Sequence, residues 1–179
     1  DDDEDFKAFS TRVVLDNLDA SGISAVAFQG DHVYVGTPGG RLFLYLASGT
    51  RGRGIFSSTG GSDGSGGKEK TEHSLLTSRR IQSRKEVVKI TIVPQFQHVL
   101  VLCGGRVSVH DMHSLETIKN STDNIAAAVK MAQGFAIDRK SQTLSRLCIA
   151  SKKKKIILFD FSRGEYTFWK DIALQNVPI

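Results

Sequence analysis

"HVLVLCGGRVSVHDM", residues 98–112, consists of two runs of strand-forming residues joined by a Gly-Gly pair. Valine and leucine dominate both runs, and paired glycines permit the positive φ angles that tight turns need. The stretch therefore predicts a β-hairpin. Its first run does not alternate apolar with polar residues, which indicates a strand that is buried on both faces.

The same hairpin pattern occurs twice more in the sequence. It is found in "HVYVGTPGGRLFLYL" (residues 32–46) and in "RLCIASKKKKIILFDF" (residues 146–161), where "IILF" is again continuously apolar. An apolar run precedes each hairpin and a weaker strand candidate follows it. The preceding runs are residues 23–28, 87–93 and 132–138, and the following ones are residues 75–81, 114–119 and 165–174. The predicted unit thus has four strands, and a helical pattern at residues 123–132 predicts a short helix between the second and third units.

Three repeated four-stranded units predict an all-β fold, a partial β-propeller of three antiparallel blades. A propeller blade lies between two neighbours, which accounts for strands that are apolar on both faces. A small three-layer sandwich would produce similar runs but gives no reason for the repeat. Propellers close with roughly four to eight blades, so we expect residues 11–179 to be the N-terminal portion of a longer ring that begins with a strand at residues 11–18.

Two segments stand apart from the predicted blades. Residues 48–74 are an insertion rich in Gly, Ser and charged residues, which cannot bury enough apolar surface to offset the entropy of ordering it, so we predict disorder. Residues 1–10 form an acidic leader, "DDDEDF" being its start, although the whole chain has a net charge of +5. The remainder is therefore strongly basic, which suits an acidic partner surface, an anionic lipid or a nucleic acid.

The sequence offers little for catalysis or metal binding. Cys103 and Cys148 lie in second strands without CxxC spacing, which favours buried, reduced packing residues. His110 and His113 are three apart near a strand end, where side chains alternate with period two, so we expect solvated histidines and no metal site. The glycine turns return into strands and not into helices, which argues against a phosphate cradle. We therefore predict no catalytic residue and no cofactor. We also predict no nucleic-acid partner, because the Arg-Gly stretch at residues 48–54 has only two arginines.

Basic residues cluster at one kind of position in the predicted topology. Blade strands run alternately up and down, so the turns between second and third strands share one face with the links between blades. Arg41 and Arg106 flank two of these turns. Six further basic residues fall in these positions and form the candidate binding face: Arg84, Lys85, Lys152, Lys153, Lys154 and Lys155. The simpler interpretation is that the lysines keep a turn solvated and hinder edge pairing.

Four stretches in order along the chain resemble the citron homology (CNH) domain. They are "VYVGTPGGRLFLY" and "KMAQGFAID", together with residues 87–116 and 147–174. This resemblance implies a non-enzymatic propeller, in most members seven-bladed. Within the family, the closing residues 154–179, "KKIILFDFSRGEYTFWKDIALQNVPI", are most similar to the vacuolar sorting subunits of the HOPS and CORVET tethering complexes and to the TGF-beta receptor-associated protein.

The resemblance to these tethering subunits implies a scaffold in endosome or vacuole fusion. The implied partners are a Rab-family or other small GTPase, other tethering-complex subunits and, peripherally, an anionic membrane. The implied location is cytoplasmic, on endosome or vacuole/lysosome membranes. The alternative branch of the family implies a regulatory module of a citron-type or germinal-centre-type kinase or a Rho exchange factor. A propeller enzyme with its catalytic groups on other blades is a third interpretation, but no residue cluster in the sequence favours it.

Overall fold

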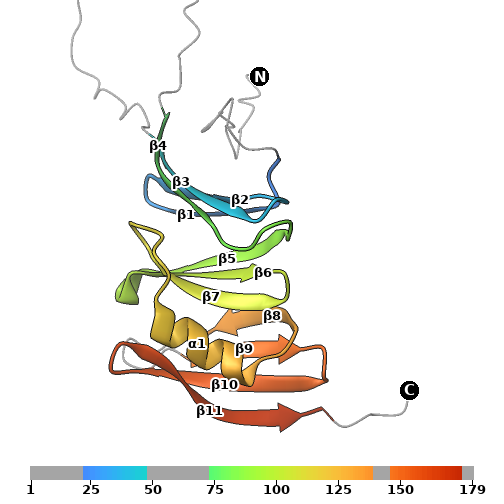
Figure 1. Cartoon of the computed structure of the whole chain (residues 1–179). Coiled ribbons are helices and arrows are strands. Elements are labelled where there is room, and N and C mark those ends of the chain that lie inside the picture. The colour runs from blue at the N-terminus through green and yellow to red at the C-terminus, as the bar shows by residue number, and fades with distance from the viewer. Residues whose placement is uncertain (1–21, 48–72, 139–145, 175–179) are drawn as a thin grey trace, which may run out of the picture.

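The computed structural model describes residues 22–47, 73–138 and 146–174, which form three antiparallel sheets stacked one after another (Figure 1). The first sheet contains β1 (Ala25–Gln29), β2 (His32–Gly36), β3 (Arg41–Ala47) and β4 (His73–Arg80). The second contains β5 (Val87–Val93), β6 (His98–Cys103) and β7 (Arg106–Asp111), with the 3-10 helix η1 (Pro94–Phe96) after β5. The third contains β8 (Ala132–Ile137), β9 (Arg146–Ser151), β10 (Lys155–Ser162) and β11 (Glu165–Ala173).

The predicted all-β fold, a partial β-propeller, is confirmed. In each sheet the hydrogen-bonded strand order follows the chain order, and neighbouring strands are antiparallel, as in propeller blades. All three hairpins have the predicted positions. We refer to the sheets as blades 1, 2 and 3. The acidic leader, the strand candidate at residues 11–18 and residues 48–72 of the predicted insertion lie outside the described residues, and β4 begins at His73.

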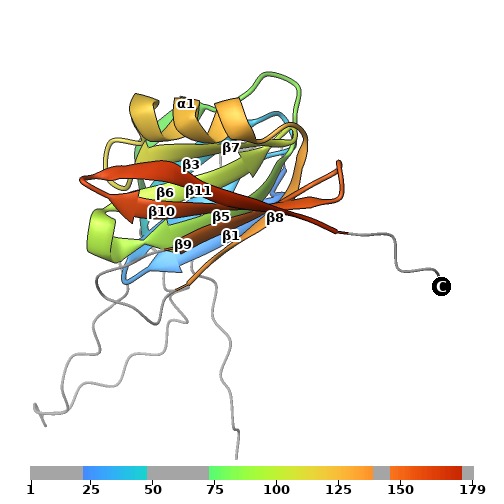
Figure 2. The same cartoon turned by 90° about the horizontal axis from the view of Figure 1, so that it is seen from below.

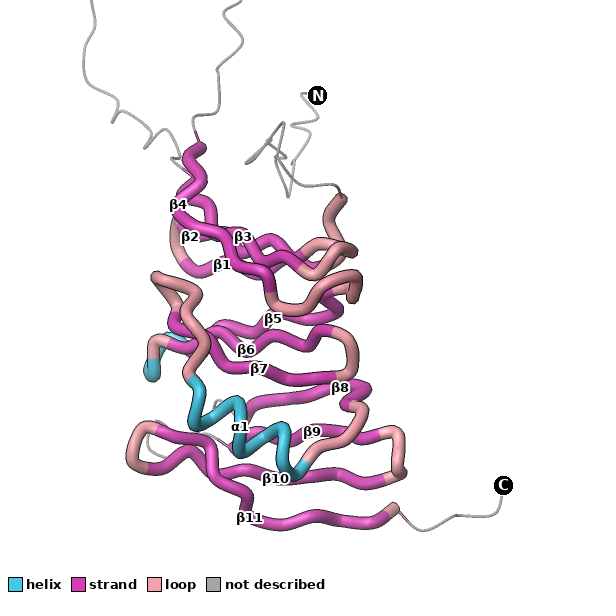
Figure 3. Tube along the Cα trace, in the orientation of Figure 1, coloured by secondary structure: helices cyan, strands magenta, loops and turns pink. Residues whose placement is uncertain are grey.

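The fourth strand predicted for blade 2 at residues 114–119 is wrong. Only Thr117 makes a bridge, with His110, and the chain then enters α1 (Lys119–Ala128). The composition of α1 itself, KNSTDNIAAA, explains why no strand continues there, because Asn, Ser and Asp are poor strand formers and the three alanines favour a helix. Figures 2 and 3 show this helix along one margin of the stack, beside β7 and the strands of blade 3. None of the described helices is long and apolar enough to cross a membrane.

Helix α1 hydrogen-bonds to the outer strands of two blades through side chains. On the blade 2 side, the hydroxyl of Thr122 accepts the backbone N–H of Val109 at 3.0 Å. On the blade 3 side, the hydroxyl of Ser121 accepts the N–H of Tyr166 at 3.1 Å, and the amide of Asn124 donates to the Tyr166 carbonyl at 3.0 Å. These contacts satisfy edge groups that a neighbouring strand would otherwise bond.

Strand β6 is the centre of the described core. All six of its residues are buried. Val99 and Val101 pack in the cluster shared with blade 1, whereas Leu100 and Leu102 pack in the cluster shared with blade 3. Alternate residues thus serve two cores, which explains why the sequence of this strand lacks polar alternation.

Strand β10 is buried on one face only. Ile157 and Phe159 are buried against blade 2, while Ile156 and Leu158 on the opposite face are half-buried. No described sheet packs on that second face. The continuous apolar run in β10 therefore does not have the two-sided burial that β6 has within this part of the chain.

Candidate functional site

Three of the four lysines, Lys152, Lys153 and Lys154, form the turn between β9 and β10, where the prediction had placed all four. The N–H of Lys154 donates to the carbonyl of Ser151 at 3.1 Å, which closes the turn. Lys154 has a φ of 55°, in the left-handed region that such turns use. Lys155 is already the first residue of β10.

The link between blades 1 and 2 packs onto turns of both blades. The N–H of Gln82 donates to the carbonyl of Gly40, and the thiol of Cys103 donates to the carbonyl of Lys85, both at 3.3 Å. Gly40 has a φ of +80°, and a Cβ there would lie 1.7 Å from the Gln82 carbonyl oxygen. Only glycine therefore allows the turn between β2 and β3 to meet this link.

The link between blades 2 and 3 makes the corresponding contacts. Ala132 donates its N–H to the carbonyl of Gly105 at 2.8 Å, in the turn between β6 and β7. Lys152 donates its N–H to the carbonyl of Met131 at 3.0 Å. The two links and the three turns thus form one continuous face, on the right side of the stack in Figure 1. The candidate residues lie on that face, whereas their role in binding stays a prediction.

The candidate residues differ in their charge environment. All six are exposed. The ammonium group of Lys155 is 2.7 Å from a carboxylate oxygen of Asp171, and this hydrogen bond holds the pKa of Asp171 below its usual value. Among the described carboxylates, none forms an ion pair with Arg84, Lys85, Lys152 or Lys153. Within the described residues these four cations therefore have no ion-pair partner, whereas Lys155 is partly neutralised.

The structure adds Lys130 to this face and turns Arg41 away from it. Lys130 is exposed in the second link, and its carbonyl accepts the hydroxyl of Ser151 at 2.7 Å. Its position between blades could have identified it, but the predicted helix at residues 123–132 included it. The guanidinium of Arg41 instead lies 5.6 Å from the ring centroid of Phe43 and donates to Ser78.

His110 is not the solvated histidine that the sequence led us to expect. It is 2% exposed, because residues 111–118 fold back beside β7. Its Nδ1 donates to the carbonyl of Leu115 at 3.1 Å, so its Nε2 accepts the hydroxyl of Ser108 at 2.8 Å. Burial lowers the pKa of His110 to about 4, and the nearby Arg79 acts in the same direction. His113 is exposed.

The two cysteines have different surroundings. Cys103 is buried between blades 1 and 2, whereas Cys148 is half-buried in β9, on the face of blade 3 away from blade 2. Both are free thiols, and burial raises the pKa of each. Neither has the lowered pKa of a nucleophile. Across residues 22–47, 73–138 and 146–174, no group of three or more His, Cys, Asp or Glu side chains could hold a metal ion.

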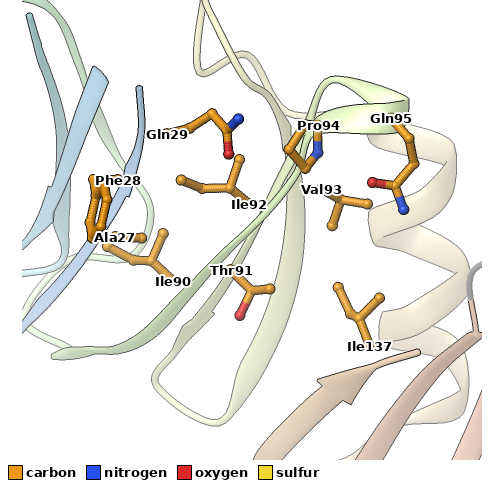
Figure 4. Close-up of a pocket in the computed structure, with 10 residues that line it drawn as sticks. All are labelled: Ala27, Phe28, Gln29, Ile90, Thr91, Ile92, Val93, Pro94, Gln95 and Ile137. Carbon is orange, nitrogen blue, oxygen red and sulfur yellow. The ribbon is translucent and has the colours of Figure 1, made fainter. Parts of the chain in front are cut away.

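A pocket of about 460 Å³ lies along the inner strands β1, β5 and β8 (Figure 4). Phe28 and Ile90 line one part of it, Gln29 and Gln95 add polar groups, and Ile137 closes the blade 3 side. Among the described residues that line it, none has an ionisable side chain and so none is an acid or base for catalysis.

Comparisons with known proteins agree with this geometry. A family model for the CNH domain matches residues 29–178. No protein with a curated description matches the sequence.

Among solved structures, the fold is similar to two computationally designed proteins. Ika4 has a TM-score of 0.53 and 14% identity, over 88% of this chain and 78% of Ika4. Ika8 has a TM-score of 0.51 and 13% identity, over 84% of this chain and 36% of Ika8. The N-terminal domain of Nup159 has a TM-score of 0.49 and 18% identity, over 84% of this chain and 30% of that one. The chain therefore spans about a third of the length of Ika8 and of the Nup159 chain.

Proposed function

The chain belongs to the CNH domain family, and on that premise we propose that it is part of a scaffold for vesicle tethering at endosomes or vacuoles. A CNH propeller is a protein-interaction module. The finer role is supported by the resemblance of residues 154–179 to HOPS and CORVET subunits. We further propose that the candidate binding face, which we call the basic face from here on, contacts a Rab-family GTPase.

The shared face of turns and links carries this proposal. Contacts between neighbouring blades place Arg84, Lys85, Lys152 and Lys153 on one side of the stack, although they are far apart in sequence. Single exposed charges contribute little to affinity, but a cluster of one sign steers an oppositely charged partner and fixes its orientation. An acidic patch on a small GTPase fits such a face.

The test is charge reversal in the full-length protein, with binding to purified Rab GTPases measured in their GTP and GDP forms. Two double variants, R84E/K85E and K152E/K153E, should each weaken binding at low salt by about tenfold or more. The matched control is K119E/R163E, which reverses two exposed charges at the other ends of the strands and should have little effect. Unchanged affinity in both basic-face variants would reject the GTPase contact, and binding to anionic vesicles alone would assign the face to a membrane.

The domains that accompany this propeller in the full-length protein distinguish the tethering role from the alternative branch of the family. Helical repeats after this propeller would favour a tethering subunit. A kinase or exchange domain before it would contradict tethering and favour a regulatory module that binds a small GTPase.

A further inference from the structure

A second pocket, of about 490 Å³, lies on the outer rim between α1 and blade 3. Ala127 and Ala128 of α1 form one wall, and Ile157 and Phe168 form an apolar floor on β10 and β11. The ion pair between Lys155 and Asp171 lies at its margin.

The pocket exists because α1 occupies the place of a fourth strand in blade 2. The first half of the helix is fixed to the start of β11 through Ser121, Asn124 and Tyr166. Farther along the helix, the short side chains of Ala127 and Ala128 leave space beside β11. A strand with larger side chains at this position would fill it.

Both walls of the pocket come from described elements, so a further blade would not cover it. Phe168 pairs with Phe159, and Asp171 pairs with Ile157, on the face of blade 3 that packs against blade 2. A further blade would pack on the opposite face, where Ile172 lies. Phe168 is nevertheless 53% exposed. An exposed aromatic side chain in a preformed concavity is typical of a site that receives an apolar anchor.

The charges around the pocket indicate which residues would flank that anchor in a bound peptide. Asp171, the one acidic side chain among the described residues of the lining, is paired with Lys155. Lys152 and Lys153 lie in the turn that precedes Lys155. Lys130 lies two residues after the end of α1. Acidic residues on either side of an apolar anchor would therefore meet cations.

We propose that this pocket docks a short acidic peptide segment of a partner protein. One aromatic or leucine side chain packs against Phe168 and the two alanines, and the flanking carboxylates contact Lys152 and Lys153. This inference rests on the protein-interaction role proposed above, but it does not depend on the GTPase contact.

The experiment measures binding of fluorescein-labelled peptides to the full-length protein by fluorescence anisotropy. The probe DEDFDE should bind at least about tenfold more tightly than DEDADE, which lacks the anchor. Its affinity should fall as salt is raised, and KRKFKR should not bind. Equal binding of DEDFDE and DEDADE would overturn the anchor, and tighter binding of KRKFKR would overturn the charge preference.

Variants place the peptide in this pocket. F168A removes the floor and A127E puts a carboxylate into the exposed wall, so each should weaken DEDFDE binding about tenfold or more. Because A127E keeps a good helix former at an exposed position, it tests the pocket even if F168A impairs folding. The matched control A126E places the same carboxylate at the neighbouring exposed position of α1, which is not part of the pocket lining, and should leave the affinity unchanged. Unchanged affinity in both F168A and A127E would overturn the proposal.

The same variants separate this inference from the GTPase contact. If F168A and A127E lose the peptide while GTPase binding persists, both proposals stand as two sites. If no GTPase binds but DEDFDE shows the expected pattern, only the GTPase proposal falls. If the GTPase binds and the peptide does not, only the pocket proposal falls.

Discussion

His110 shows how one residue is decided by its surroundings. Its ring is buried, and both nitrogens have neutral partners, Leu115 and Ser108. A charged ring would place a second proton on Nε2, which accepts a hydrogen bond here, and would lie close to Arg79. The fold therefore holds the neutral form.

We predict that the free energy of unfolding falls as the pH drops from about 6.5 to about 4. The unfolded chain binds a proton on His110 below its ordinary pKa near 6.5, whereas the folded chain does so only near 4. In this window the unfolded state binds more protons, so stability decreases as the pH falls, by roughly 3 kcal/mol in total. Urea unfolding at several pH values measures it.

The control for this pH dependence is H110N, whose amide replaces the donor at Nδ1 but does not titrate. It should lower stability at neutral pH and flatten the profile between pH 6.5 and 4. His98, whose pKa is also lowered by burial, should account for part of the slope that remains. A profile as steep in H110N as in the original protein would contradict the assignment.

At the scale of elements, α1 replaces a strand and joins two blades. Its side chains bond to the backbone of Val109 in β7 and of Tyr166 in β11. A helix in this place both satisfies exposed strand edges and creates the rim pocket. Removal of α1 would therefore weaken the packing between blades 2 and 3 as well as blade 2 itself.

We predict that S121A destabilises the protein by about 1–3 kcal/mol. Ser121 is fully buried, and its replacement by alanine removes the hydroxyl that accepts the buried N–H of Tyr166. Amide exchange at Tyr166 should accelerate together with the fall in unfolding free energy. The control D123A, at an exposed position of the same helix, should change stability by less than about 0.5 kcal/mol. Equal effects of the two variants would contradict a specific role for the Ser121 hydroxyl.

At the scale of the whole molecule, the three blades differ in what covers them. Blade 2 is packed on both faces, whereas blade 3 has one face with half-buried residues such as Cys148 and Leu158. The expected seven-bladed ring would place another blade on that face. The reactivity of the Cys148 thiol can test whether a blade covers that face. Cys103, which is buried between two blades, serves as the internal reference.

We predict that Cys148 reacts with a thiol reagent faster than Cys103 in residues 1–179 alone. In a protein that continues beyond Ile179, Cys148 should react as slowly as Cys103, because the next blade would cover it. C148S and C103S variants identify the thiol that reacts. Fast labelling of Cys148 in the longer protein would contradict a ring that continues from blade 3.

The sequence by itself determined the repeated hairpins, the partial propeller and the face on which the candidate basic residues lie. These features depend on residues that are close together in the sequence, namely the composition of each strand, the glycines of the turns and the alternating direction of successive strands. It did not predict that α1 replaces a strand, because the helix is held in place by hydrogen bonds that Thr122 and Ser121 accept from the N–H groups of Val109 and Tyr166, which belong to two different blades.

Only the tertiary structure decided which residues lie together and which charges are paired. The ion pair between Lys155 and Asp171, the position of Lys130 beside the lysine turn and the burial of His110 all depend on contacts between separate segments. The rim pocket has the same origin, because Phe168 and Ala127 meet only after blade 3 packs against blade 2. Periodicity specifies which face of a strand a residue is on, but the distance between two charges or the space between a helix and a strand is fixed by packing.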